Sequence, residues 1–285
     1  MKKLFIVFTC LFLLSACSTR LAYNFLDFII KWYVGQYVSL DSKQKRVLSG
    51  AADEFHQWHR RTQLDIYADY IDYLLKRLDE KAIDGKWVHA QTDVAQDFID
   101  VSAQHFKPTI IDIMHSLSDE QAKQVLKNLA KDRKDYKKKY VDISAKKQAK
   151  RRKNELLDYI APFFGSFTKE QKKWIADWST KDIKPYETLT LKQQEIWSDE
   201  VERALEARQD KAQLDKNVDE IILYRTDDWD PDLEAILDHN QAVSYALIAR
   251  LVNNQTPSQR KKMFSKLKSY RDDFRAMAKK AKTPQ

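Results

Sequence analysis

Apolar side chains recur at intervals of three or four residues along most of this chain. Between residues 42 and 78, Leu48, Phe55, Ile66 and Leu74 belong to such a series, which places them on one side of an α-helix. No comparable stretch shows the strict alternation of a half-buried β-strand. The pattern predicts an all-α protein, an elongated multi-helix bundle of about eight helices. Similar spacing occurs in the stretches 88–106, 119–160, 190–223, 231–252 and 257–280.

Five predicted helix starts carry the same local signal, a Ser, Thr or Asp followed three residues later by Gln. This pattern is typical of a capping box, in which the first side chain accepts from a backbone N–H of the first turn and Gln reaches back to the N-cap N–H. Asp230 followed by Pro231 predicts one more capped start. The five sequences are LDSKQ from Leu40, LSDEQ from Leu117, FTKEQ from Phe167, LTLKQ from Leu189 and QTPSQ from Gln255.

Residues 1–16 predict a cleaved lipoprotein signal peptide. Lys2 and Lys3 precede an apolar segment of eleven residues, 4–14, which is shorter than the roughly 20 residues that span a bilayer. Small residues then lead to Cys17. The pattern resembles that of bacterial lipoproteins, so we expect a diacylglycerol and an N-acyl chain on Cys17. The alternative is an ordinary secretory signal followed by an incidental cysteine.

The residue after the cysteine bears on the location of the protein. Ser18 resembles the Gram-negative sorting pattern that directs lipoproteins to the outer membrane. We therefore expect a lipidated N-terminus at residues 17–20 and a single all-helical periplasmic domain at residues 21–282, on the periplasmic face of the outer membrane. Cys10 leaves with the signal, so the mature chain has no thiol for a disulfide or a nucleophile.

Composition disfavours several classes of enzyme. With only 4 Gly, the chain offers few positions for phosphate-cradling loops. The Walker A, dinucleotide-binding, serine-hydrolase and zinc-protease motifs are absent from the sequence. We expect a non-catalytic protein with no catalytic residues, no metal and no cofactor besides the acyl chains on Cys17.

Residues 21–38 form a nearly apolar stretch with one narrow polar stripe. The stripe consists of Asn24, Asp27, Lys31 and Gly35 at helical spacing. Two interpretations remain open: a core helix covered by later helices, or an interfacial helix lying on the leaflet that holds the lipid.

Positive charge is concentrated in one segment of a chain whose net charge is +8. Residues 131–153 hold 12 basic and 3 acidic side chains. Such density favours binding of a polyanion, with lipopolysaccharide, anionic lipid and peptidoglycan as candidates and nucleic acid excluded by the expected location. The alternative is a solvated helix face partly neutralised by the acidic stretch 226–238. The candidate residues are Lys137, Lys138, Lys139, Lys146, Lys147, Lys150, Arg151, Arg152 and Lys153.

A second cluster consists of Trp58, His59, Arg60 and Arg61. His56 lies three residues before His59, on the same helix face. Two imidazoles suggest a metal-dependent hydrolase as one alternative function, although zinc usually takes three or four ligands. The other interpretation is structural: Trp58 packs in the core, and His59 or Arg60 bonds to the segment 21–38.

Two resemblances add expectations. The first is carried by Cys17, Tyr23-Asn24, Trp32-Tyr33, Tyr37, Leu40, Trp58-His59-Arg60, Gln63-Leu64 and Tyr67-Ala68. In these residues the stretch 17–75 resembles the DUF6279 family of uncharacterised proteobacterial lipoproteins. The resemblance implies a helical lipoprotein of the outer membrane and supplies no catalytic residues. The second is weaker: LSDEQ and LTLKQ are similar to the repeats of Spy-like periplasmic chaperones, which makes a helical chaperone an alternative function.

Taken together, the sequence predicts a lipid-anchored helical protein that binds an envelope polyanion or an envelope protein. The expected membrane attachment depends on Cys17, and the expected binding depends on the basic segment 131–153.

Overall fold

The computed structural model describes residues 23, 25–223 and 230–282, and Cys17 lies outside them. Within this part of the chain all regular structure is helical, which confirms the all-α prediction. Two short π-helical segments, η1 (Lys137–Val141) and η2 (Trp178–Asp182), follow α7 and α9. The α-helices are α3 (Leu26–Gly35), α4 (Ser42–Thr62), α5 (Leu64–Glu80), α6 (Gly85–Ser116), α7 (Asp119–Tyr136), α8 (Ala145–Phe164), α9 (Lys169–Asp177), α10 (Glu187–Glu206), α11 (Lys211–Ile222), α12 (Pro231–Asn253) and α13 (Pro257–Lys282).

The described chain has eleven α-helices, so the expected number of about eight is wrong. Three stretches that we expected to be continuous are each divided in two. The divisions fall at Gln63, between η1 and Ala145, and between Glu206 and Lys211. None of these divisions contains Gly or Pro, the residues that most strongly signal a break from sequence. Pro108, by contrast, lies inside α6.

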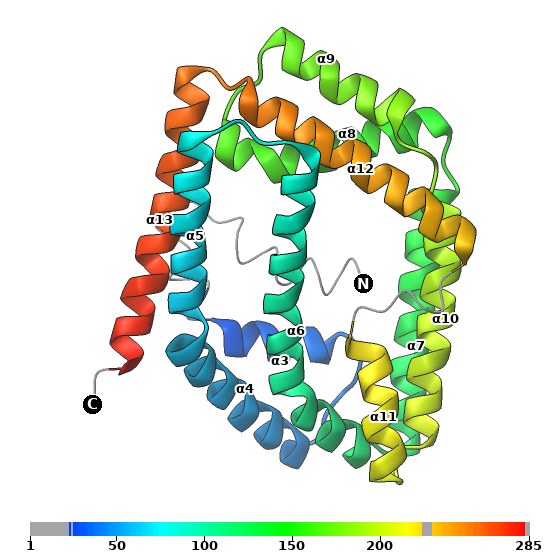
Figure 1. The fold of residues 1–285 in the computed structure, drawn as a ribbon. Coiled ribbons are helices and arrows are strands. Elements are labelled where there is room, and N and C mark those ends of the chain that lie inside the picture. Colours follow the sequence, from blue (N-terminus) through cyan, green and yellow to red (C-terminus); the bar gives the residue numbers. More distant parts are fainter. Residues whose placement is uncertain (1–22, 24, 224–229, 283–285) are drawn as a thin grey trace.

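The helices lie along the sides of an open frame rather than in one elongated bundle (Figure 1). Helices α5 and α13 pair on one side, and α7 and α10 pair on the other. Helices α8, α9 and α12 lie along the upper edge, α3 and α4 lie in the lower half, and α6 crosses between the edges. Among the residues described, no helix is both long and apolar enough to span a bilayer.

The interior consists of four hydrophobic clusters that share bordering residues. The largest surrounds Leu64 and Tyr270 and joins α4, α5 and α13. Ile30 and Phe106 border both this cluster and the second, which lies between α4, α6, α7 and α10. Phe163 connects the first cluster to the third, near the upper edge. Because the clusters are connected in this way, a change of volume in one is transmitted to its neighbours.

Four of the five predicted capping boxes are present. Asp41, Ser118 and Thr168 each accept from the backbone N–H of the Gln three residues later, and each Gln accepts from the backbone of its cap. Thr256 and Gln259 make the same two contacts, at 3.2 and 2.9 Å. The fifth prediction is wrong: α10 begins at Glu187, which places Thr190 inside the helix. Asp230 caps α12 as predicted.

The Gln side chains of these boxes also join the helix starts in pairs. Gln44 and Gln121 donate to each other's side-chain oxygen at 3.0 and 2.8 Å, so the starts of α4 and α7 meet. Gln171 and Gln259 do the same at 3.0 and 2.8 Å for α9 and α13. Each Gln also donates to a backbone carbonyl just before the partner's cap. The same arrangement therefore joins two separate pairs of helix starts, α4 with α7 and α9 with α13.

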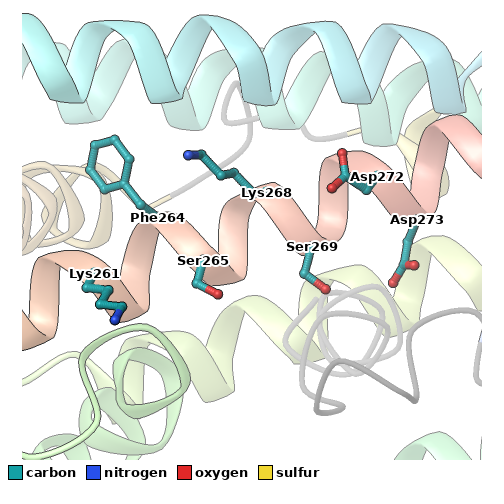
Figure 2. A pocket seen from close by; sticks show the side chains of 7 residues that line it. All are labelled: Lys261, Phe264, Ser265, Lys268, Ser269, Asp272 and Asp273. Atoms are coloured by element: carbon teal, nitrogen blue, oxygen red, sulfur yellow. The ribbon is translucent and has the colours of Figure 1, made fainter.

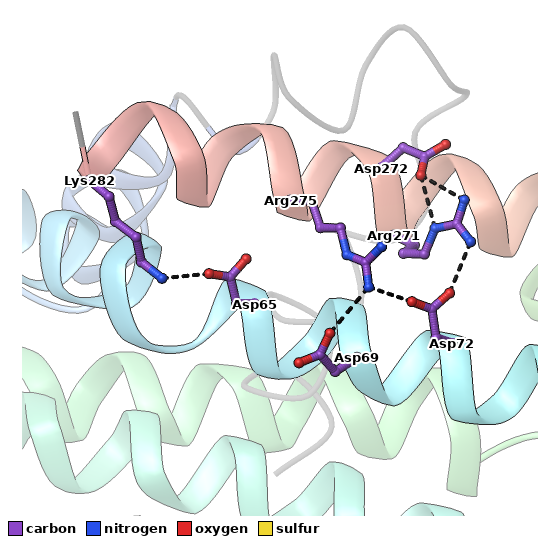
Figure 3. A network of polar contacts seen from close by, with 7 residues as sticks. All are labelled: Asp65, Asp69, Asp72, Arg271, Asp272, Arg275 and Lys282. Carbon is purple, nitrogen blue, oxygen red and sulfur yellow. Dashed lines mark hydrogen bonds and ion pairs between the residues drawn. The ribbon is translucent and has the colours of Figure 1, made fainter.

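The pairing of α5 with α13 is reinforced by a row of opposite charges (Figure 3). Lys282 donates to Asp65 at 2.6 Å, and Arg275 contacts both Asp69 and Asp72. Arg271 donates to Asp72 at 2.9 Å. The row runs in opposite directions along the two helices, which fixes their antiparallel register.

Candidate functional site

The predicted basic segment folds into a corner formed by the end of α7, η1 and the start of α8. We define the basic corner by the lysines of this segment that are exposed. No described carboxylate lies within ion-pairing distance of any of them. Two of them were not among the nine predicted residues, although they lie within the predicted segment. The eight are Lys131, Lys134, Lys137, Lys138, Lys139, Lys146, Lys147 and Lys150.

A tyrosine pair supports this corner from inside. Tyr136 and Tyr140 stack with ring centroids 4.7 Å apart. Lys139 Nζ lies 4.9 Å from the Tyr140 ring centroid, and the guanidinium of Arg151 lies 5.0 Å from it. The Tyr140 hydroxyl donates to Glu155 of α8 at 2.9 Å. Cation–π attraction and this hydrogen bond therefore hold η1 against α8.

Arg152 is a correction to the predicted polyanion site. It is buried, with its guanidinium 2.5 Å from the buried carboxylate of Glu187 and a further contact to the Ser179 carbonyl at 3.4 Å. A buried charge requires such a partner, because desolvation of an isolated ion is costly. Arg152 thus ties α8 to the start of α10, and it is not available to a ligand. Arg151 and Lys153 are half-buried.

The acidic stretch contributes little to neutralising the basic corner in the part of it that is described. Asp230 pairs with Lys192 of α10 at 2.7 Å and caps α12. Residues 224–229 lie outside the described residues.

His56 and His59, the two histidines in and beside the Trp58–Arg61 cluster, lie at the edge of the core. His59 is buried, with Nδ1 2.7 Å from the Tyr23 hydroxyl and Nε2 3.2 Å from the Tyr67 hydroxyl. Burial lowers the pKa of His59 to about 3. Burial and then Arg60 lower the pKa of His56 to about 4. Both imidazoles are therefore neutral at pH 7.

The other members of the cluster have structural contacts as well. The Trp58 ring stacks on His105 at 3.7 Å, with the two planes nearly parallel. Arg60 lies 5.3 Å from the Tyr23 ring centroid. Arg61 is exposed and donates to Gln57 on its own helix. The structural interpretation is thereby favoured: Trp58 packs in the core, and His59 bonds to Tyr23 of the preceding segment. In the described chain, no three His, Cys, Asp or Glu side chains are grouped so that they could hold a metal ion.

One open concavity of 630 Å³ lies along α13 (Figure 2). None of the predicted site residues lines it. Asp272, one of its carboxylates, already pairs with Arg271. Because all the described lining residues come from a single helix, the concavity brings no catalytic groups together from separate elements. They are Lys261, Phe264, Ser265, Lys268, Ser269, Asp272 and Asp273.

Comparisons with known proteins identify a family. Residues 36–234 match the model of a family of unknown function, DUF6279. The match begins after Tyr23-Asn24 and Trp32-Tyr33, two of the motifs that suggested the resemblance, and it extends far beyond residue 75. Comparison with curated proteins and with solved structures gave no match. Because the match covers more than half of the sequence, the chain belongs to the DUF6279 family.

Proposed function

We propose that this protein is a lipid-anchored, non-catalytic component of the outer membrane, on its periplasmic face, that binds an envelope polyanion through the basic corner. One observation supports the binding role above all: eight exposed lysines with no described carboxylate partner gather where α7, η1 and α8 meet. The anchor rests on the signal-like residues 1–16 and the following Cys17.

The chemistry of the ligand follows from the charge of the corner. Lysines at helical spacings of three and four repel one another. A ligand with several phosphates or carboxylates relieves that repulsion and releases its own counterions. Lipopolysaccharide, anionic lipid and peptidoglycan all offer such groups. The lysine ammonium is a point charge on a flexible side chain, whereas the arginine guanidinium is a rigid planar group. We therefore expect the corner to recognise the charge density of a ligand more than its shape.

The chaperone alternative gains no support from the two repeats that suggested it, LSDEQ and LTLKQ. Gln121 of the first accepts from its own cap and pairs with Gln44. Gln193 of the second is buried inside α10. Neither side chain is presented to a client.

Binding to purified sacculi, lipopolysaccharide and anionic vesicles tests the proposal. The test variant replaces Lys137, Lys138, Lys139, Lys146 and Lys147 with Gln. We expect at least tenfold weaker binding to the cognate polyanion, and weaker binding of the wild type as salt rises, because surface attraction is screened.

A matched variant controls for net charge alone. It replaces five exposed lysines elsewhere with Gln, and we expect it to bind nearly as well as the wild type. Equal losses in both variants, or binding that does not respond to salt, would contradict the proposal. The control lysines are Lys81, Lys86, Lys172, Lys184 and Lys216.

A further inference from the structure

Helix α3 has one face in the core and one face in solvent. Leu26 is buried, and Ile30 and Val34 pack against the hydrophobic clusters. On the other side, Phe25, Phe28 and Trp32 are 52%, 58% and 55% exposed. They follow one another at intervals of three and four residues, so they form one continuous aromatic face.

This face is the densest exposed apolar feature in the described chain. The remaining large hydrophobic side chains that are strongly exposed lie on other helices and are spread over α4, α5, α6 and α8. Single exposed apolar residues of that kind are ordinary on a soluble surface. They are Val47, Ile66, Tyr73, Val101 and Tyr159.

The polar stripe of the same helix does not cover the aromatic face. Asp27 and Lys31 bond to each other at 2.9 Å, and Lys31 also donates to Ser49 of α4 at 3.5 Å. The stripe is therefore directed toward α4, and the aromatic side chains are left in solvent. One side of α3 therefore packs in the core, and the other side has no described partner.

We infer that the aromatic face of α3 inserts into the headgroup–acyl boundary of the leaflet that holds the lipid anchor. This inference rests on the proposed acylation of Cys17. Seven residues lie between Cys17 and Phe25, and the eight steps from one Cα to the next reach at most about 29 Å when the chain is fully extended. An acyl chain at Cys17 would therefore keep α3 close to the bilayer surface.

The chemistry of the face fits that location. Phe and Trp side chains are typical of the apolar side of helices that lie in a membrane interface, and Trp is enriched at the boundary with water. The first turns of α4, the helix that packs beside α3, expose Lys43, Lys45 and Arg46. Exposed cations on this neighbouring helix suit a surface of anionic headgroups.

A second copy of the chain fits the face less well. Three aromatic side chains that are about half exposed offer roughly 300 Å² of contact, taking 150–250 Å² for a whole side chain. A stable protein interface needs about 800 Å² from each partner. A bilayer has no such requirement, because the acyl chains already supply most of the attachment.

Quenching of Trp fluorescence in vesicles tests this inference. The lipidated full-length mature protein is reconstituted into vesicles that contain lipids brominated near the headgroup. The difference between the wild type and Trp32→Phe isolates the emission of Trp32, and Phe keeps the face apolar. We expect at least half of that emission to be quenched. The matched control is Trp87→Phe, which isolates a tryptophan of α6, and we expect less than a tenth of its emission to be quenched.

Flotation of the same samples separates this inference from the proposed anchor. If the protein floats with the vesicles and the Trp32 emission is quenched, the inference is supported. If it floats and Trp32 is unquenched, the face lies away from the bilayer and the inference is overturned, while the anchor stands. If Trp32 is unquenched, the wild type is dimeric and the Phe28→Ser variant is monomeric, the face belongs to an interface with a second copy. If the protein does not float, both the anchor and the inference fail.

Discussion

Buried and half-buried polar side chains in this protein are held by partners from distant parts of the sequence. The Tyr37 hydroxyl donates to Asp132 at 2.7 Å, and burial, followed by its hydrogen bonds, raises the pKa of that tyrosine. Arg152 pairs with Glu187 in the same way. His59 lies between two tyrosine hydroxyls. Removing Arg152 or Glu187 leaves the other buried without its ion-pair partner, which costs more than the bond itself contributes.

The titration of His59 predicts how stability depends on pH. Its pKa is about 3 in the folded protein and about 6.5 in an unfolded chain. Above pH 6.5 both states are neutral, and the contribution of the folded site is fully present. As pH falls below 6.5, the His59 imidazole binds a proton in the unfolded chain but stays neutral in the folded protein. Stability therefore declines toward pH 3, by up to about 1.4 kcal/mol for each pH unit.

His59→Gln should remove the part of this dependence that His59 contributes, while His56, whose pKa is lowered to about 4, keeps its own contribution. We expect the variant to be less stable than the wild type at pH 7, because Gln fits the two tyrosine hydroxyls less well, but to lose less stability between pH 6 and pH 4. Urea unfolding at several pH values measures both slopes. His89→Gln changes a histidine whose side chain is 56% exposed, and we expect it to keep the slope of the wild type. Parallel slopes for wild type and His59→Gln would contradict the prediction.

At the scale of the helix, the local sequence was sufficient to predict a helix start where that start depends only on residues of its own first turn. Asp41, Ser118, Thr168 and Thr256 cap helices as predicted. Thr190 does not, because α10 already begins at Glu187, where the carboxylate accepts from Arg152 and from the backbone of Tyr186. That contact crosses 35 residues, and nothing in the local pattern reports it.

The positions at which helices break, and the helices that pair with each other, could not be predicted from local sequence either. The periodicity of residues 42–78 continues across Gln63, yet α4 and α5 run in different directions (Figure 1). Gln44 lies 77 residues from Gln121, and Gln171 lies 88 residues from Gln259. Likewise the basic segment was visible in the sequence, whereas the burial of Arg152 within it required the position of Glu187.

The reciprocal Gln pairs predict coupled effects on stability. Gln171→Ala and Gln259→Ala should each cost about 1–3 kcal/mol, because each leaves a cap N–H without its acceptor and removes one hydrogen bond from the remaining amide. Together they should cost less than the sum, with a coupling of about 0.5–3 kcal/mol, since one replacement already breaks the pair. A double-mutant cycle in urea unfolding measures this coupling. Gln44→Ala combined with Gln171→Ala is the matched control, because those residues belong to different pairs and should be additive. Additivity in both cycles would show that the paired amides contribute nothing jointly.

At the scale of the whole molecule, α3 approaches the α7 end of the basic corner, because Tyr37, two residues after α3, donates to Asp132 beside Lys131. Helix α3 crosses the lower half of the view in Figure 1, whereas α8 lies along the upper edge. The basic corner lies at the junction of α7 and α8. If α3 rests on the leaflet, the part of the corner at the start of α8 is held off the surface that the anchor occupies. Of the three candidate polyanions, peptidoglycan is then the one best placed to reach it.

This arrangement predicts that the protein can hold a membrane and a polyanion at the same time. Vesicles carrying the lipidated protein should co-sediment with purified sacculi at low salt and separate from them at high salt. Replacing Lys137, Lys138, Lys139, Lys146 and Lys147 with Gln should abolish the co-sedimentation while leaving flotation intact. The opposite outcome is equally informative. If the protein binds sacculi when it is free in detergent but not when it is on vesicles, the basic corner faces the leaflet, and its ligands are the headgroups beside the anchor.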